Sequence, residues 1–188
     1  NITGGCLYSM QDVDVKLVER FRKGDRGAFA MLVDRYEKPI YNAALRITRN
    51  RDDAADITQN VFVKSMEKIE SYDRKRALFS WLYKIAINES LNMVSRRKRR
   101  AAVRLDSVIS PPTPEDDYTL VESSGYLQRA LDTMSMDHRV VIVLKHLLLL
   151  SYQEIADILE IPEKTVKSRL FSARQALRRQ LLAEGYVR

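Results

Sequence analysis

The chain has few of the residues that build disulfide frameworks, metal centres or phosphate-binding loops. Cys6 is the one cysteine among 188 residues, which excludes an internal disulfide framework. His138 and His146 are the two histidines, and neither has a neighbouring cysteine or histidine to complete a metal site. No glycine-rich phosphate-binding motif is present in the sequence. We therefore expect no metal, no cofactor, no small-molecule substrate and no catalytic residue.

Long apolar runs and alternating strand patterns are also missing. No run approaches the roughly 20 apolar residues of a membrane-spanning helix, so we expect a soluble, cytoplasmic protein. Apolar residues instead recur three and four positions apart, which predicts an all-α fold. The net charge of +7 favours a polyanionic partner such as nucleic acid.

Proline is concentrated in one segment, where it interrupts the helical pattern. Pro111, Pro112 and Pro114 exclude a regular helix at this point. Residues 103–123 carry five acidic residues and one basic residue inside an otherwise basic chain. This composition is typical of an extended, polar linker.

The linker predicts two small helical domains. We expect the first domain at residues 12–100, the flexible acidic linker at 101–123 and the second domain at 124–188. Residues 1–11 do not share the helical pattern of the first domain, and we expect them to be a leader, with Met10 as the natural start.

Residues 151–179 show the pattern of a helix-turn-helix motif. Pro162 favours a break before it and suits the first turn of a following helix. Between Lys164 and Arg179 there are six basic residues and no acidic ones. A cationic second helix is typical of insertion into the major groove of DNA. The alternative is an ordinary helical hairpin with a solvated basic face.

The fourth predicted helix of the first domain, residues 78–100, carries one polar face. At 100° per residue, five polar residues fall within about 80° of one another. These residues are Lys84, Asn88, Asn92, Ser95 and Arg99. Trp81 lies in the same sector, although core packing is an alternative for this side chain. Amide, aromatic and basic groups on one face favour contact with nucleic acid, whereas a solubilising helix with a basic tail is the alternative.

The third predicted helix begins at Asp52 and Asp53, where negative charge suits the helix dipole. Its spacing predicts a buried face. The residues expected to point inward are Ile57, Val61, Phe62, Met66 and Ile69.

Four segments, in this order, resemble the extracytoplasmic-function (ECF) group of bacterial RNA polymerase sigma factors. LVERFRKGDRGAFAMLVDRY looks like the opening segment of that family, and DDAADITQNVFVKSMEKIESY resembles its core-polymerase-binding segment. FSWLYKIAINESLNMVSRRKRR resembles the segment for the promoter −10 element, and SYQEIADILEIPEKTVKSRLFSARQALRR the segment for the −35 element. The resemblance implies a non-catalytic subunit that binds core RNA polymerase, directs it to promoters and helps to melt the DNA.

The resemblance also implies roles for individual residues on double-stranded and melted promoter DNA. The expected core-polymerase contacts are Asp56, Gln59, Asn60, Phe62 and Val63. The expected −10 contacts are Tyr72, Lys84, Asn88, Asn92, Arg96 and Arg99. The expected −35 contacts are Thr165, Lys167, Ser168, Arg169, Phe171 and Arg174. Tyr72 and Asn88 would hold an unstacked base. Core packing is the alternative role for Phe62, Val63 and Phe171.

Four consecutive leucines, residues 147–150, precede the helix-turn-helix motif. Four leucines in a row cannot all point inward in a small domain. We expect at least one of Leu148 and Leu149 to be exposed in the free chain and covered by an anti-sigma protein. Contact with a membrane would then arise only through a membrane-bound anti-sigma protein.

Two other classes of function compete with this interpretation. A stand-alone regulator would bind an operator through the helix-turn-helix motif, but the polar helix of the first domain would be superfluous in such a protein. A nucleic-acid enzyme is poorly supported, because no acidic residues cluster as a metal-binding set beside either basic surface.

Overall fold

The structure is a computed structural model that describes residues 3–103 and 129–183, with side chains described for residues 11–100 and 129–183. The predicted acidic linker lies outside the described residues, except that residues 101–103 form the end of a helix. A helix begins at Thr3, so most of the predicted leader is helical.

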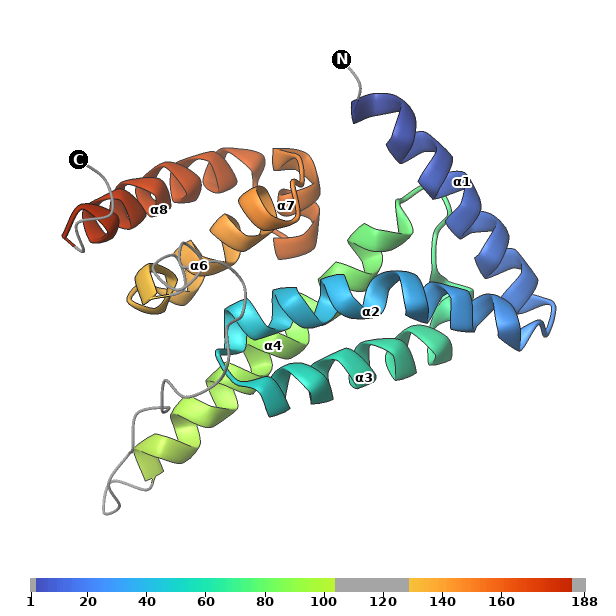
Figure 1. The fold of residues 1–188 in the computed structure, drawn as a ribbon, viewed down its shortest axis with the longest axis horizontal. Coiled ribbons are helices and arrows are strands. Elements are labelled where there is room, and N and C mark those ends of the chain that lie inside the picture. Colours follow the sequence, from blue (N-terminus) through green and yellow to red (C-terminus); the bar gives the residue numbers. More distant parts are fainter. Residues whose placement is uncertain (1–2, 104–128, 184–188) are drawn as a thin grey trace. The chain divides into compact units, whose positions relative to one another are not determined.

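Most of the described residues are helical and none of them lies in a β-strand, in agreement with the predicted all-α fold. The chain folds as two compact units, residues 1–45 with 50–90 and residues 46–49 with 91–188. Residues 129–132 are also helical. The helices are α1 (Thr3–Arg22), α2 (Arg26–Thr48), α3 (Arg51–Glu67), the 3-10 helix η1 (Ile69–Ser71), α4 (Leu78–Val103), α6 (Met136–Ile142), the π-helix η2 (Val143–Leu147), α7 (Tyr152–Leu159) and α8 (Glu163–Ala183) (Figure 1).

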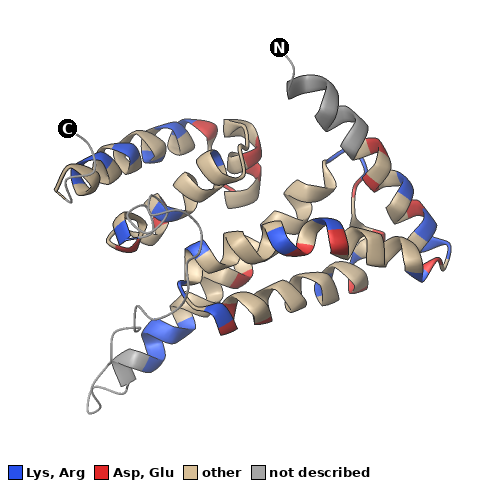
Figure 2. Ribbon diagram, in the orientation of Figure 1, with Lys and Arg blue, Asp and Glu red and all other residues tan. Residues whose placement is uncertain are grey.

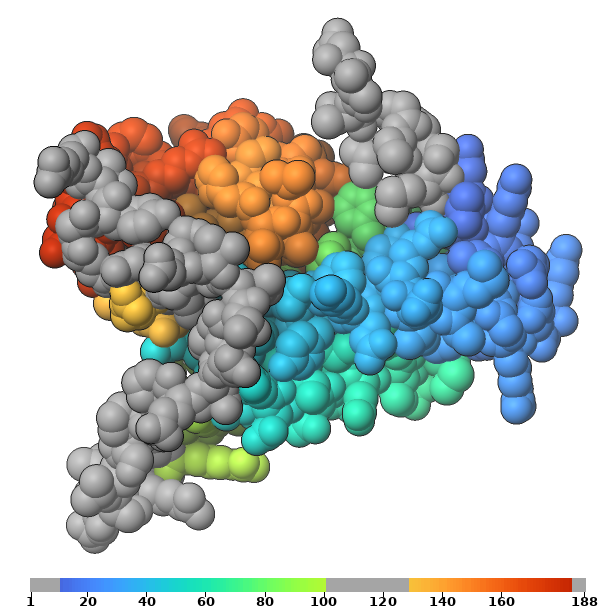
Figure 3. All heavy atoms as spheres, in the orientation of Figure 1, coloured from blue at the N-terminus to red at the C-terminus, as the bar shows by residue number. Residues whose placement is uncertain are grey.

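The first unit is built around one apolar core. α2 and α3 run side by side in opposite directions and present a continuous surface (Figures 1 and 3). Each helix contributes one buried stripe, as the spacing of three and four residues predicts. The most deeply buried side chains of this core include Val18, Ile40, Ile57, Val61, Leu78 and Ile87.

Short polar contacts set the ends of these helices. Gly24 has a φ of +95°, a conformation that costs glycine little, and this allows the chain to turn between α1 and α2. Asp25 then accepts a hydrogen bond from the Ala28 amide at 3.2 Å. At the start of α3, Asn50 Oδ1 accepts a hydrogen bond from the Asp53 amide at 2.8 Å.

A buried carboxylate joins α1 to α2. The Asp14 side chain is 2% exposed, and the Tyr36 hydroxyl donates a short hydrogen bond to it. Arg35 Nη1 lies 2.9 Å from Asp14 Oδ1. Burial raises the pKa of the Asp14 carboxyl above its ordinary value, while Tyr36 and Arg35 act in the opposite direction. A paired carboxylate therefore lies at this helix contact, where an apolar residue would be usual.

The second unit has an irregular helix before the leucine run. α6 ends at Ile142, and the chain continues directly as the π-helix η2. The Leu148 amide bonds the Val143 carbonyl at 3.1 Å, which is the spacing of a π turn. Leu149 then has a φ of +56° and lies 80% exposed, whereas Leu150 is 4% exposed. The wide turn thus directs one leucine into the core and its neighbour into solvent.

We predict that Asp14→Ala lowers the free energy of unfolding by about 3 kcal/mol, because it leaves the buried Tyr36 hydroxyl and Arg35 without their acceptor. Denaturant unfolding followed by circular dichroism measures the change. Asp12→Ala removes an exposed carboxylate from the same helix and should change the free energy by less than about 0.5 kcal/mol. Equal effects of the two substitutions would contradict the role given to Asp14.

Candidate nucleic-acid interface

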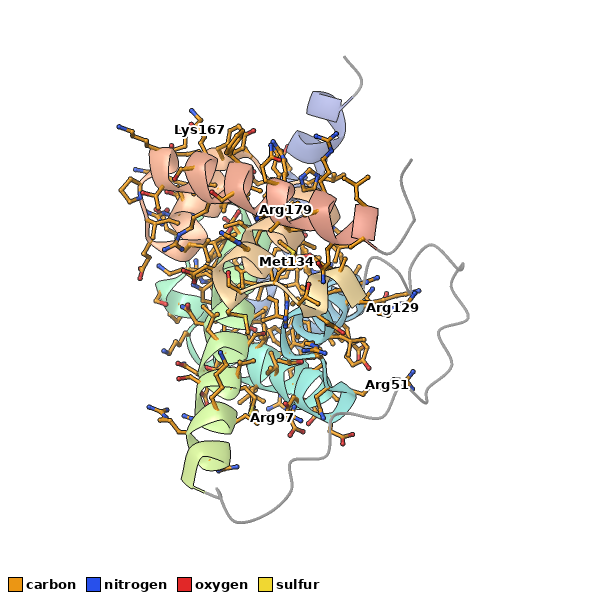
Figure 4. The ribbon with its side chains drawn as sticks, turned by 90° about the vertical axis from the view of Figure 1, so that its left-hand side faces the viewer. Arg51, Arg97, Arg129, Met134, Lys167 and Arg179 are labelled. Carbon is orange, nitrogen blue, oxygen red and sulfur yellow. The ribbon has the colours of Figure 1, made fainter. Side chains whose placement is uncertain are left out.

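The polar face predicted on α4 is exposed along most of its length. The exposed residues on this side of the helix are Asn88, Asn92, Ser95, Arg96 and Arg99. Leu78, Leu82 and Ala86 are buried on the opposite side of the helix. The basic residues gather towards the C-terminal end of α4 (Figure 2), and Arg97 projects from this part of the helix (Figure 4). Amide groups therefore precede a cluster of positive charge on one accessible face.

Lys84 and Trp81, at the start of this face, are half-buried. The Trp81 ring lies 5.5 Å from the Tyr72 ring, centroid to centroid. Trp81 also lines a small apolar cavity with Phe62 and Leu78, so it belongs in part to the core. The accessible part of the polar face therefore begins at Asn88.

Tyr72 begins the loop between η1 and α4, residues 72–77, which we call the η1–α4 loop. Its side chain is 4% exposed, and its hydroxyl donates a hydrogen bond to the Arg76 carbonyl at 2.6 Å. Burial raises the pKa of Tyr72 to about 12. Asp73 Oδ1 accepts a hydrogen bond from the Lys75 amide at 2.9 Å, which closes the turn. The Tyr72 side chain therefore supports the loop from inside. Asn88, the other residue expected to hold an unstacked base, is exposed.

Four exposed residues form the outer side of the same loop. They are Asp73, Arg74, Lys75 and Arg76. Three of the four are basic and adjacent in the sequence, so the loop presents positive charge to solvent. Positive charge of this kind contacts phosphate groups without reading sequence.

α3 presents a second exposed face. The exposed residues on one arc of about 100° are Asp56, Gln59, Asn60, Val63 and Glu67. Val63 is 48% exposed, so the core-packing alternative does not hold for it, whereas Phe62 is 8% exposed and packs inward. Met66 was expected to point inward, and this was wrong, because it is 47% exposed. The same 100° spacing places Met66 beyond the buried arc, which is the signal that could have identified it.

The helix-turn-helix motif has the predicted elements and a well-defined turn. Ser151 and Glu154 form a reciprocal capping box at the start of α7. Glu160 ends α7 with a φ of +54°, and the Ile161 amide bonds the Ala156 carbonyl at 3.1 Å. The Pro162 carbonyl accepts a hydrogen bond from the Thr165 amide at 2.8 Å, and α8 begins. Val166, Leu170 and Ala173 form its buried stripe.

The opposite face of α8 is exposed and basic. Lys167, Ser168, Phe171 and Arg174 are exposed, whereas Thr165 and Arg169 are half-buried. Phe171 is 66% exposed, so the alternative role in the core does not hold. Lys167 and Arg179 both project from α8 (Figure 4). A large exposed aromatic group among basic side chains suits contact with a DNA groove.

Several basic side chains of this unit already have partners. Lys167 Nζ lies 2.5 Å from Glu163 Oε1, which raises the pKa of Lys167, and 5.6 Å from the centroid of the Tyr152 ring. Arg169 Nη2 lies 3.5 Å from Asp137 Oδ2.

Arg174 has a neutral partner instead of an acidic one. Its Nε donates to His146 Nε2 at 3.3 Å. Burial, together with the charges of Arg174 and Lys145, lowers the pKa of His146. These effects favour the neutral form of His146, which can accept this hydrogen bond.

Comparison with known proteins identifies two segments of the chain. A model of sigma-70 region 2 matches residues 32–100, and a model of sigma-70 region 4 matches residues 124–177. The chain is 35% identical over 180 residues to the ECF RNA polymerase sigma factor SigW of Bacillus subtilis (strain 168), covering 88% of this chain and 95% of that protein. The chain belongs to the ECF sigma factors. It is also 33% identical over 181 residues to the ECF RNA polymerase sigma-E factor of Escherichia coli (strain K12), covering 90% and 94% of the two chains.

Two solved sigma factors share the fold of this ECF sigma factor. One is the sigma factor RpoE, solved with the anti-sigma factor NepR from Bartonella quintana, with a TM-score of 0.72 and 24% identity over 81% of this chain and 96% of that one. The other is CnrH in complex with the cytosolic domain of CnrY, with a TM-score of 0.71 and 24% identity over 91% and 98% of the two chains.

Metal-binding clusters and membrane-spanning helices are absent from the described residues of the ECF sigma factor. No group of three His, Cys, Asp or Glu side chains among them is placed to hold a metal ion. None of the described helices is both long enough and apolar enough to span a membrane.

Proposed function

We propose that this ECF sigma factor binds core RNA polymerase in the cytoplasm and gives it promoter specificity, while the polymerase supplies all catalytic groups. The observation that carries this function is the presence, in one chain, of three exposed helical faces. These are the polar face of α3, the amide-rich basic face of α4 and the basic face of α8. A stand-alone operator-binding protein would need only the last of them.

We assign a different binding partner or promoter element to each of the three faces. The exposed residues of α3 would contact core polymerase through Asp56, Gln59, Asn60 and Val63, with Met66 and Glu67 extending this surface. Asn88, Asn92, Arg96 and Arg99 of α4 would contact the −10 element, beside the basic η1–α4 loop. Because Tyr72 is buried, its proposed contribution is to support this loop and to line the site of an unstacked base once the loop engages DNA.

The face of α8 would contact the −35 element. Lys167, Ser168 and Phe171 are exposed where the N-terminal half of a recognition helix meets base edges. Arg169 and Arg174 would contact phosphate and fix the register of the helix on DNA. Thr165, which is half-buried, would contribute at the edge of this face.

In vitro transcription tests the function as a whole. Core RNA polymerase with this chain should start transcription at a defined set of sites in a genomic fragment library, and core polymerase alone should not. DNA binding without association with core polymerase would instead support the stand-alone regulator.

We expect Val63→Asp to weaken association with core polymerase by at least about tenfold, because it places a carboxylate in an apolar part of the contact. Fluorescence anisotropy of labelled sigma factor, titrated with core polymerase, measures the affinity. Val13→Asp makes the same change on α1, where Val13 is 40% exposed, and should leave the affinity unchanged. A similar loss in both variants would assign the effect to the fold, and no loss in either would remove α3 from the contact.

Lys167→Ala and Arg174→Ala should weaken −35 binding in different ways. A base-reading lysine contributes about 1–3 kcal/mol of discrimination, so Lys167→Ala should relax the preference at one or two positions of the −35 element. A phosphate contact carries no sequence information, so Arg174→Ala should weaken binding to all sequences and reduce the salt dependence by about one counterion. Binding selection from a randomised −35 library, repeated at several salt concentrations, separates the two. A shift in base preference with Arg174→Ala would reverse these roles.

The exposed leucine of the second unit fits regulation by an anti-sigma protein. Leu149 is 80% exposed, Leu147 is 45% exposed and Leu148 is half-buried, which leaves an apolar projection beside the helix-turn-helix motif. A leucine with positive φ carries a backbone cost, and its exposed side chain gains little from packing in the free chain. We therefore propose that Leu148 and Leu149 belong to the surface that an anti-sigma protein covers.

Leu149→Gly should raise the free energy of unfolding by up to about 1 kcal/mol, because glycine adopts positive φ without a steric cost. The same substitution should weaken inhibition by an anti-sigma protein. Thermal unfolding measures the first effect, and titration of transcription with an anti-sigma protein that inhibits the unaltered chain measures the second. Leu149→Asn, which also tolerates positive φ, should behave alike. Full inhibition of both variants would exclude Leu149 from this surface.

A further inference from the structure

Arg22, at the end of α1, holds the backbone that leads into the η1–α4 loop. Arg22 Nη2 donates to the carbonyl oxygens of Ile69, Glu70 and Tyr72, at 2.5, 3.2 and 3.1 Å. The contact therefore joins residues that lie 47 to 50 positions apart in the sequence. Residues 32–100 match the sigma-70 region 2 model, so Arg22 lies outside the matched segment.

The three acceptors explain why a cation is needed at this position. Ile69 and Glu70 belong to η1 and Tyr72 follows it, so the three carbonyl groups lie around the end of a short helix. The Ile69 carbonyl already accepts a hydrogen bond from the Tyr72 amide at 3.2 Å, and Arg22 is a second donor to it. Carbonyl groups at a helix C-terminus carry partial negative charge, which favours a cation there. One guanidinium nitrogen meets all three of them and fixes the direction in which the chain leaves η1.

The carbonyl contacts, and not an ion pair, set the position of this guanidinium. Arg22 Nε is buried without a hydrogen-bond acceptor, and Glu70 Oε2 lies 3.5 Å away from it. Glu70 is itself 76% exposed, so its attraction is screened by water. Hydrogen bonds from a charged donor are the stronger interaction here.

A second contact ties the tip of the loop to the same helix. Arg74 Nη1 lies 2.6 Å from Glu19 Oε1, about one turn before Arg22 on α1. Together with the internal bond from Tyr72 to Arg76, the η1–α4 loop is held at its start by Arg22, at its tip by Glu19 and from within by Tyr72. The loop is therefore formed before any DNA arrives.

We propose that Arg22 is a positioning residue for promoter opening: it pre-orders the η1–α4 loop so that the −10 element meets a preformed surface. This inference rests on the proposed function, since it assigns the loop to −10 recognition. A preformed site avoids the ordering cost that a flexible loop would incur on binding. Without Arg22 the loop must be ordered at the moment of binding, and discrimination at the −10 element falls.

The test compares Arg22→Met with a matched control on the same helix. Arg20 donates two hydrogen bonds to Asp25 Oδ2, at 2.9 and 2.7 Å, and this contact stays within the turn between α1 and α2. Arg20→Met thus removes an arginine and its ion pair two residues away from Arg22. Glu19→Gln is a milder variant of the loop contact, because the Glu19–Arg74 pair is exposed and its loss leaves the core intact.

The readout is discrimination at the −10 element, which a general loss of stability would not change. Transcription from a promoter found with the unaltered chain is divided by transcription from the same promoter with one −10 base changed. Hydrogen bonds from a charged group contribute about tenfold or more, so Arg22→Met should reduce this ratio by about tenfold. Glu19→Gln should reduce it less, Arg22→Lys should restore part of it, and Arg20→Met should leave it unchanged.

Binding of a single-stranded oligonucleotide that carries the −10 element gives a second measurement. Arg22→Met should weaken this binding while the affinity for core polymerase stays the same. If Arg22→Met does not fold, Glu19→Gln and Arg22→Lys decide the question through the same ratio. An unchanged ratio in the folded variants would overturn the role of Arg22. If the unaltered chain neither binds core polymerase nor opens a promoter, the proposed function itself fails.

Discussion

The structure depends on a constraint that applies to each of its working helices: one side must be buried for the domain to fold, and the other side must remain free for a partner. α4 buries Leu78, Leu82 and Ala86 and keeps its amide and basic groups in water. α8 does the same with Val166 and Leu170. Because apolar burial on one face stabilises each helix, side chains on the opposite face can be substituted at little cost to stability. An ECF sigma factor can therefore alter what it recognises without altering its fold.

Loops and helix ends are held by polar contacts where apolar burial is not available. Asp14 joins α1 to α2 through Arg35 and Tyr36, and Arg22 meets three carbonyl groups at the end of η1. Asp14 and Arg22 both lie on α1, so this helix has two structural roles in the first unit. It completes the core with Leu17 and Val18, and it supports the η1–α4 loop through Arg22.

Much of the fold and of the candidate interface could be predicted from the sequence, because helical spacing determines which side of a helix is buried. The helix-turn-helix motif, the polar face of α4 and the exposure of at least one of Leu148 and Leu149 follow from local patterns. The prediction that Met66 points inward was wrong, and the geometry of α3 explains why. Met66 lies just beyond the buried arc of α3, so its apolar character alone was misleading. Other features depend on contacts that the sequence pattern does not contain. Tyr72 suits a base-stacking role, yet its hydroxyl bonds its own loop, and Arg22 contacts a segment that follows it by 47 residues.

The ion pairs of the second unit change how its positive charge should be counted. Six basic residues lie between Lys164 and Arg179, but Lys167 is already paired with Glu163 and Arg169 with Asp137. DNA phosphate groups would have to compete with these two carboxylates, so the long-range attraction of α8 for DNA is weaker than its composition suggests. Weak attraction at long range shortens the time spent on non-specific sequence, and the specific contacts then account for a larger share of the binding free energy. A recognition helix whose cations are paired with carboxylates of its own unit therefore favours selectivity over affinity.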